Sequence, residues 1–254
     1  MLVCAAAIYG VGASPAFDYT KMQLEGVQFT DPVAVEAALA AARGENLFRL
    51  STRPLLAEIE RLPTVDHARI DVRLPATLAV TIEEREPVVV WRAGEARYLA
   101  AADGTLFAKL GDGTGGAAGA AAGLPEVDDT RTGSSTLAVG SRLAPVDVDA
   151  ATRLASLRPA DVGSSAVALS IAVTDENGFV LTTRPAGWSA VFGFYTPSLR
   201  TTELIPGQVR LLRSLLEGRE PQVDRVILAS DTDGTYLPRT TPKPSSSAKP
   251  SKVP

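Results

Sequence analysis

The residues whose types could support chemistry are few, and their spacing argues against a catalytic site. Glu83, Glu84 and Glu86 form an acidic cluster, but successive side chains of a strand point to opposite faces, so Glu83 and Glu84 would not converge on one proton or cation. His67 is the only histidine and has no cysteine near it. The glycines within residues 111–116 formally fit a dinucleotide loop, yet the run continues into Gly-Ala repeats where a binding loop would open a helix. We therefore expect no enzyme activity, no cofactor and no metal site.

A secreted or membrane-anchored hydrolase is the enzyme class that these residues speak against most directly. A Ser-His-Asp triad needs a histidine base, and neither Ser164 nor Ser165 stands in the context of a nucleophile elbow. The single cysteine, Cys4, lies in the apolar N-terminus, so an intramolecular disulfide and a cysteine-based metal site are excluded. Cysteine usage suits both an exported and a cytoplasmic protein, and leaves the compartment open.

Charge and length narrow the remaining classes. The chain has 254 residues and a net charge of -4, which is enough chain for one large domain or two small ones. Nucleic-acid binding is not expected, because it needs a basic face. The tail, residues 238–254, has four basic residues and no acidic one, and Pro, Ser and Lys dominate it. Such a segment buries too little apolar surface to offset its ordering entropy, so we predict that it is disordered.

The N-terminus carries the first positive signal. Residues 1–17 are uncharged and mostly apolar, and the first basic residue is Lys21. A membrane-spanning helix needs roughly 20 apolar residues, and a secretory signal would begin with a basic region. We interpret residues 1–17 as the remnant of a transmembrane helix and expect the native product to begin upstream of Met1. A buried core helix and an incomplete signal segment remain as alternatives.

Residues 18–86 have the pattern of a small two-layer module. Asp31-Pro32 predicts a helix start, and Ser51-Thr52 opens a second helix that Pro63 ends. Apolar residues alternate from Ala68 to Leu74 and from Leu78 to Ile82, which predicts two half-buried strands with Leu74 and Ile82 on the buried face. With a strand at 21–29, the order is strand, helix, helix, strand, strand, with two helices on one sheet face.

Residues 87–237 predict a second, mostly β domain with two helices, so the fold class is α+β. Residues 111–123 are almost all Gly and Ala and are interpreted as a flexible insertion. Asn177-Gly178 is the strongest hairpin signal in the chain. Strands are expected at 88–91, 98–101, 106–110, 167–173, 179–183, 189–194 and 223–229, and helices at 145–157 and 208–216.

Several segments of the first module carry a family resemblance. They are Leu24-Glu25-Gly26-Val27, Gly44-Glu45-Asn46-Leu47-Phe48-Arg49-Leu50, Leu62-Pro63-Thr64-Val65, Leu74-Pro75-Ala76-Thr77-Leu78, Glu83-Glu84-Arg85-Glu86-Pro87 and Asp103-Gly104-Thr105-Leu106-Phe107. In these segments the chain resembles the FtsQ/DivIB cell-division family, with a POTRA domain at 18–86 and a β domain at 87–237. One departure concerns the last strand, where the family usually has an acidic-Leu-Arg signature and this chain has Val226-Ile227-Leu228-Ala229.

The resemblance implies a protein that crosses the cytoplasmic membrane once and places its C-terminal domains outside it, at the division septum. It implies a scaffold that binds FtsB/FtsL-like membrane proteins and other divisome components and helps control septum formation, with no nucleic acid or small-molecule substrate. The alternative function is a POTRA-type assembly factor of the envelope that binds extended polypeptide.

The expected partner site is the last strand, residues 223–229. Nothing regular is predicted after it, so we expect an open sheet edge that accepts a partner strand through main-chain hydrogen bonds. Tyr236 is expected to close over the partner as an aromatic anchor. The alternative is that the strand is internal or covered by residues 231–237. The predicted partner-binding residues are Val226, Ile227, Leu228, Ala229, Ser230 and Tyr236.

Overall fold

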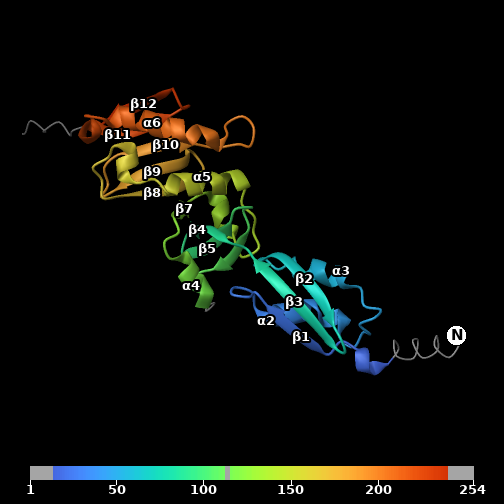
Figure 1. Cartoon of the computed structure of the whole chain (residues 1–254). Helices are drawn as coiled ribbons and strands as arrows, with labels where there is room; N and C mark the ends of the chain where they lie inside the picture. The colour runs from blue at the N-terminus through green and yellow to red at the C-terminus, as the bar shows by residue number, and fades with distance from the viewer. Residues whose placement is uncertain (1–13, 112–114, 240–254) are drawn as a thin grey trace, which may run out of the picture. The chain divides into compact units, whose positions relative to one another are not determined.

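The computed structural model describes residues 14–111 and 115–239, and the chain forms two compact units (Figure 1). The first unit is Met1–Ala155 and the second is Ser156–Pro254. The predicted module of residues 18–86 lies at the start of the first unit, and residues 87–155 group with it.

The first module has the predicted order of elements. Strand β1 (Lys21–Glu25) is followed by helix α2 (Pro32–Ala38), the 3-10 turn η2 (Ala40–Ala42), helix α3 (Thr52–Ile59) and strands β2 (Val65–Arg73) and β3 (Thr77–Glu84). The sheet order is β1-β3-β2, with β1 parallel and β2 antiparallel to β3. The parallel pairing is possible because the two helices carry the chain across the sheet between β1 and β3.

Local chemistry sets where α2 begins. The carboxylate of Asp31 accepts a hydrogen bond from the backbone N–H of Val33 at 2.9 Å, and Pro32 occupies the first helical position. The missing N–H of proline costs nothing there, because the first N–H groups of a helix have no partner inside it. The predicted start at Asp31-Pro32 is confirmed.

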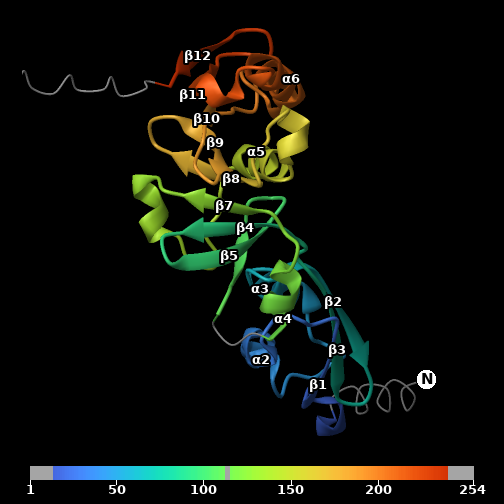
Figure 2. The same cartoon turned by 90° about the vertical axis from the view of Figure 1, so that its left-hand side faces the viewer.

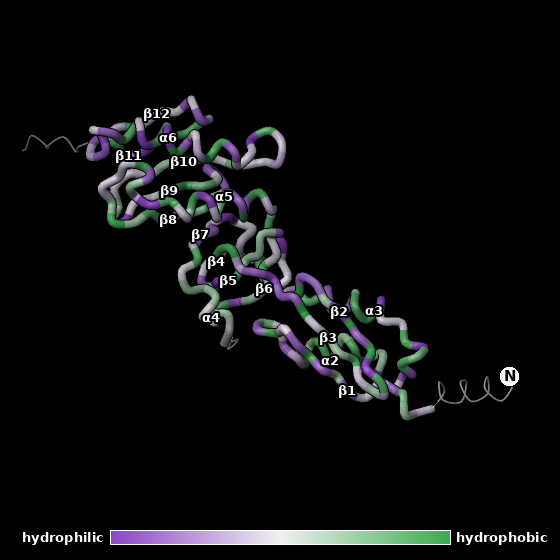
Figure 3. Tube along the Cα trace, in the orientation of Figure 1, coloured by the Kyte–Doolittle hydropathy of each residue, from purple (hydrophilic) through white to green (hydrophobic). Residues whose placement is uncertain are grey.

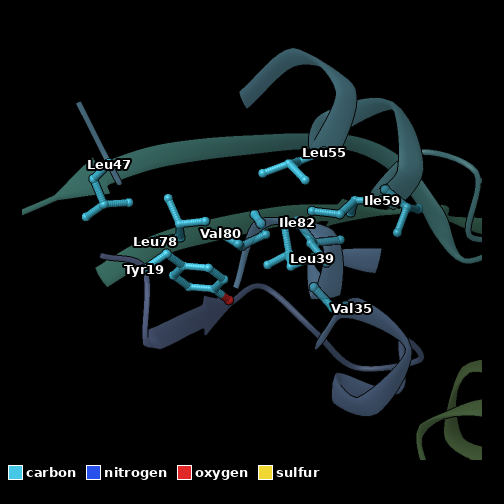
Figure 4. Close-up of a cluster of buried hydrophobic side chains, with 11 residues drawn as sticks. Tyr19, Val35, Leu39, Leu47, Leu55, Ile59, Leu78, Val80 and Ile82 are labelled. Carbon is cyan, nitrogen blue, oxygen red and sulfur yellow. The ribbon is translucent and has the colours of Figure 1, made fainter. Parts of the chain in front are cut away.

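The core of this module lies between the helices and one face of the sheet (Figure 4). Val35 of α2, Leu39 at the C-terminal cap of α2 and Ile59 of α3 are fully buried against β3. Leu78, Val80 and Ile82 alternate along β3 and point toward the helices. The period of two that predicted a half-buried strand is thus realised in the side chains of β3 that face the helices, and the tube in Figure 3 shows both hydrophobic and hydrophilic residues along β2 and β3.

The expectation that Leu74 lies on the buried face is wrong. Leu74 is 53% exposed and Val72 is 41% exposed, whereas Ala68 and Ile70 on the same strand pack on the core. Strand β2 ends at Arg73, and Leu74 begins the turn that leads to β3. The helices do not extend over this end of the strand, so the alternation continues in the sequence beyond the point where the core stops.

The second half of the first unit has a four-strand order β7-β4-β5-β6. The strands are β4 (Pro87–Ala93), β5 (Ala96–Ala101), β6 (Leu106–Lys109) and β7 (Glu126–Asp129), and helix α5 (Pro145–Ala155) follows. The three strands predicted between 88 and 110 and the helix at 145–157 are confirmed, whereas β7 was not predicted.

The prediction of a flexible insertion at 111–123 is wrong for most of this segment. Residues Gly115–Ala121 form helix α4, and Ala117 is 1% exposed and packs in a cluster with Val90, Leu99 and Phe107. The described residues therefore hold three α-helices after residue 87, not two. Residues 112–114 lie outside the described residues.

The second unit contains the five-strand order β12-β11-β10-β9-β8 (Figure 2). Its strands are β8 (Ala168–Thr174), β9 (Gly178–Arg184), β10 (Ser189–Gly193), β11 (Val223–Leu228) and β12 (Gly234–Pro238), and helix α6 (Ile205–Leu216) lies between β10 and β11 in the chain. The hairpin predicted at Asn177-Gly178 is confirmed by the antiparallel β8–β9 pair. Gly178 has φ 63°, a conformation that favours glycine.

The two termini also bear on the predictions. Residues 1–13 of the expected transmembrane segment lie outside the described residues, and Pro15–Phe17 form a 3-10 turn, η1, capped by Ser14. Within residues 14–111 and 115–239, no helix is long and apolar enough to cross a bilayer. At the other end, Pro238 belongs to β12 and Arg239 is hydrogen-bonded, so the tail predicted from 238 starts too early. Its remainder, 240–254, lies outside the described residues.

Candidate partner-binding edge

The expected open edge at residues 223–229 is not an edge. Strand β11 pairs with β10 in parallel on one side and with β12 antiparallel on the other. The strand that ends the sheet order is β12, and within the described residues no strand pairs with its outer side. The alternative that residues 231–237 cover the strand is therefore the correct one. The prediction failed because Gly234–Pro238 is short and ends in proline, which hides its strand character.

The two faces of β11 divide the predicted site residues. Val226 and Leu228 are buried, at 0% and 1% exposure, on the face covered by α6, whereas Ile227 is 39% exposed and Ala229 is exposed. This is the alternation of faces expected of successive residues in a strand. Buried side chains cannot contact a partner directly, so Val226 and Leu228 only stabilise the sheet by packing against α6.

Tyr236 lies on β12 itself. It stands opposite Val226 in the ladder, and is half-buried on the α6 side of the sheet. Thr235 stands opposite Ile227, and Leu237, 48% exposed, stands opposite Arg225, on the other face. A partner strand beside β12 would thus find Tyr236 on one face and Thr235 and Leu237 on the other.

The backbone of β12 has a defined outward side. The N–H of Arg239 donates to the carbonyl of Gln222 at 2.7 Å, on the β11 side. Because successive residues of an antiparallel strand direct their N–H and C=O groups to opposite sides, Leu237 and Thr235 face β11, and Tyr236 faces outward. Pro238 also falls on the outward side, where an edge strand tolerates a residue without an N–H. The outward N–H and C=O groups of Gly234 and Tyr236 are those available to a partner.

Two arginines that the sequence did not single out hold this part of the sheet in place. The guanidinium of Arg239 donates to the carbonyls of Gly187 at 2.7 Å and Val223 at 3.4 Å, which fixes the end of β12. Arg200 donates to the carbonyls of Phe192 and Leu228, where β10 and β11 end. Arg239 was missed because it stands in a stretch whose composition predicts disorder.

Aromatic side chains can anchor a partner, and four of them differ clearly in burial. Trp91, Trp188 and Tyr195 are 0%, 3% and 4% exposed. The hydroxyl of Tyr195 donates a hydrogen bond to the side-chain oxygen of the buried Gln208 at 2.7 Å, and burial raises the pKa of Tyr195. These three rings belong to the interior, and Tyr236 is the accessible one of the four.

The acidic cluster at 83–86 is structural. The carboxylate of Glu84 accepts hydrogen bonds from the backbone N–H groups of Gln28, Phe29 and Thr30, at distances from 2.6 to 3.0 Å. Arg85, with its side chain 13% exposed, pairs with Asp66 and Asp103. A solvated strand end would be the ordinary account of such a charged cluster, but it does not describe these two side chains. His67 has its side chain 73% exposed, as expected of a surface residue.

Glu220 is the most strongly hydrogen-bonded carboxylate of the second unit. It accepts from the hydroxyls of Ser164 and Ser165, from the backbone N–H of Ser165 and from the indole of Trp188 at 2.9 Å. It lines a shallow cavity of about 390 Å³. Partial burial opposes the charged form, but these donors outweigh it and lower the pKa of Glu220 to about 2. A carboxylate with its acceptors filled by its own chain serves as an anchor and not as a base.

This pKa gives a prediction for acid stability. The pKa of Glu220 is lowered in the folded state from an ordinary value of 4.5, so its contribution is fully present above pH 4.5 and is lost as the pH falls toward 2. After allowance for the solvent contact of this side chain, we expect ionised Glu220 to contribute about 1–2 kcal/mol to the free energy of unfolding. The free energy of unfolding, measured by urea titration between pH 5 and pH 2, should fall less steeply for Glu220→Gln than for the unaltered chain. Equal slopes would contradict the prediction.

Comparison with known proteins identifies the first module. Residues 17–85 match the family model described as "POTRA domain, FtsQ-type". A Cell division protein FtsQ of Chloroflexus aurantiacus is 25% identical over 235 residues, covering 91% of this chain and 74% of that protein. The chain is a relative of the FtsQ cell-division proteins. The predicted resemblance and the predicted POTRA domain are confirmed.

Two further FtsQ proteins are similar to this chain over shorter stretches. The FtsQ protein of Chloroflexus aggregans is 32% identical over 98 residues, and that of Corynebacterium glutamicum is 30% identical over 106 residues. These matches span 36% and 48% of the two proteins, so the chain covers less than half of either. The match to the Chloroflexus aurantiacus protein extends well beyond the POTRA module, into the residues that form the second unit.

Proposed function

We propose that this FtsQ relative is a non-catalytic scaffold of the cell-division machinery that takes up a strand of an FtsB/FtsL-like membrane protein along the outer side of β12. In this proposal the chain is anchored in the cytoplasmic membrane by residues 1–17, and its folded units lie outside that membrane at the septum. The observation that carries the proposal is the position of β12 at the end of its sheet. The relatives, all named for cell division, support the cellular role.

The composition of β12 suits strand addition. Gly234–Pro238 contains no charged residue, whereas edge strands that must avoid pairing usually carry lysine, inward charge or a cover. The strand is also held at both ends, by the bond from Ser230 N–H to the Asp233 carbonyl at 3.0 Å and by Arg239. A pre-organised edge loses little conformational entropy when a partner pairs with it.

Side chains at the edge give the partner strand a choice of faces. Tyr236 offers an aromatic contact on the α6 side, and Leu237 with Ile227 offers an apolar contact on the other. We therefore expect the partner strand to carry apolar residues at neighbouring positions, one for each face of the sheet. Ala229 and Ser230, next to the turn that leads to β12, would meet its end.

Binding of extended polypeptide at the POTRA sheet, as in an envelope assembly factor, has less support. The outer strand β2 carries charge along its length, with Asp66, Arg69, Asp71 and Arg73, and Arg69 pairs with Asp71 at 3.0 Å. Charged side chains on an edge strand oppose pairing with a second chain. The uncharged β12 is the better acceptor.

The test is a proline substitution on the edge strand. Tyr236→Pro removes an outward N–H but none that faces β11, so the fold should persist. Loss of one ladder bond and of the aromatic contact should weaken binding of the FtsB-like protein of the same bacterium about 10–100-fold, measured by titration calorimetry. Leu228→Pro is unsuitable, because β11 is bonded on both sides.

Two controls make this test decisive. Tyr236→Ala keeps the N–H and should retain part of the affinity, while Thr235→Ala, on the same strand, should bind within about twofold of the unaltered chain. Each variant must keep the melting temperature of the unaltered chain to within a few degrees. Unchanged binding by a folded Tyr236→Pro variant would place the partner elsewhere.

A further inference from the structure

One end of the POTRA module carries exposed apolar side chains that the partner edge does not explain. We define the N-terminal tip as η1 (Pro15–Phe17), the loop 44–48 and the β2–β3 turn 74–76. Both views show η1 and the β2–β3 turn at the same end of the module (Figures 1 and 2). The backbone joins them, because Leu47 N–H donates to the Phe17 carbonyl at 2.9 Å and Thr20 N–H donates to the Ala76 carbonyl at 3.1 Å.

The tip exposes large apolar groups from two separate loops. Phe48 is 55% exposed and Leu74 is 53% exposed. The ring of Phe48 stands edge-on to that of Phe17, with centroids 5.0 Å apart. Pro15, Ala16 and Pro75 are also exposed. Single exposed apolar residues are ordinary on a protein surface, but here two loops and η1 present several of them at one end of the module.

The chain that enters the tip is itself apolar. Residues 2–13 contain no charged side chain, and they lead directly into Ser14, which caps η1. In the proposed arrangement these residues lie in the membrane, and the side chains of the tip are therefore held close to the lipid headgroups. Aromatic and aliphatic groups at this depth gain free energy by burying apolar area at the boundary of headgroups and acyl chains.

We propose that the N-terminal tip is a membrane-docking surface, with Phe48 and Leu74 inserted into the lipid interface and Phe17 supporting Phe48. The inference rests on the membrane anchoring included in the proposed function and adds that the folded module itself touches the bilayer. Such contact fixes the orientation of the POTRA module relative to the membrane, where a single tether would leave it free to turn.

Charge at the tip favours apolar insertion over electrostatic attraction. Lys21, Arg49 and Arg73 are exposed there, and Glu45 and Asp18 lie beside them, so the tip is close to neutral. When basic and acidic residues nearly cancel in this way, attraction to anionic lipid contributes little free energy of binding. Docking should therefore occur on zwitterionic lipid, which also removes any contribution from the basic residues of the tail.

The test places a fluorescent reporter at single cysteines in the full chain. With Cys4→Ser as background, Phe48→Cys and Leu74→Cys are labelled with an environment-sensitive dye, and each variant leaves the other apolar side chain in place. The chain is reconstituted on phosphatidylcholine vesicles that contain lipid with a nitroxide in the acyl chain, which quenches dye only at membrane depth. Flotation of the vesicles measures anchoring independently.

Val33→Cys is the matched control. Val33 is an apolar residue of the same module, 68% exposed, at the start of α2. The start of α2 lies near Glu84, at one end of β3. The tip lies near Thr77, at the other end of β3. The two ends of a strand of this length are about 25 Å apart. We expect quenching at 48 and 74 to exceed that at 33 by roughly threefold.

The outcomes separate this inference from the proposed function. Flotation with equal, weak quenching at all three positions overturns the docking surface and leaves the anchoring intact. Failure to float overturns both the anchoring and the docking surface. Binding of the FtsB-like partner to β12 is measured apart from vesicles, so neither result alters it.

Discussion

Replacing Ile82 with aspartate is expected to unfold the POTRA module, whereas the same replacement at Leu74 is expected to be tolerated. Ile82 is 2% exposed and points into the core between α2, α3 and β3 (Figure 4). An unpaired carboxylate there lowers the free energy of unfolding by about 4 kcal/mol, in addition to the loss of the apolar contact. Leu74 is 53% exposed, so its replacement should change the free energy of unfolding by less than about 0.5 kcal/mol.

Circular dichroism and thermal melting of the two variants measure this difference. The pair is matched because both positions are apolar and both fall on the face that a strict alternation would bury. Comparable destabilisation by the two substitutions would mean that the helices also protect the β2–β3 turn. A wild-type melting curve for Ile82→Asp would contradict the assignment of the buried face.

The second large effect is expected at Asp129, on β7. Its side chain is 1% exposed and accepts hydrogen bonds from the indole of Trp91 at 3.0 Å and from the guanidinium of Arg131 at 2.8 Å. The hydrogen bonds that the Arg131 guanidinium donates to Asp129 are the main cause that raises the pKa of Arg131. Arg131 also pairs with Asp147 at 2.9 Å, so this carboxylate ties β4, β7 and the start of α5 together.

Asp129→Ala leaves a buried indole N–H and part of a guanidinium without a partner. Breaking a buried ion pair from one side typically costs about 3–5 kcal/mol, and we expect the free energy of unfolding to fall by that amount in urea titrations. Asp128→Ala is the matched control, because Asp128 is the neighbouring residue and its carboxylate pairs with Arg92 at 2.7 Å. The side chain of Asp128 is 35% exposed. A more exposed pair is worth less than about 1 kcal/mol. Equal losses for the two variants would show that Asp129 is solvated.

Local signals in the sequence account for the elements that were predicted correctly. Asp31-Pro32 sets a helix start and Asn177-Gly178 sets a hairpin because each depends on the chemistry of two adjacent residues. The order of elements in the first module follows in the same way from alternation, helical spacing and turn residues.

Helix α4 shows where local signals fail. Its residues Gly115–Ala121 are glycine and alanine only, and each glycine weakens an isolated helix by about 1 kcal/mol. In the folded chain, Ala117 is buried and Ala120 and Ala121 pack beside Phe107. A short helix of this kind is stabilised by its contacts, and those contacts come from strands that lie elsewhere in the sequence.

The sequence by itself determined the order of elements in the POTRA module, the start of α2, the β8–β9 hairpin and the family to which the chain is related, because these depend on neighbouring residues. Only the tertiary structure decided which strand ends the sheet. Gly234–Pro238 has weak strand propensity, and it becomes a strand because β11 offers it a row of unpaired backbone groups. Tertiary structure also moved the accessible edge from residues 223–229 to β12 and placed Phe48 against Phe17, since both depend on contacts between distant segments of the chain.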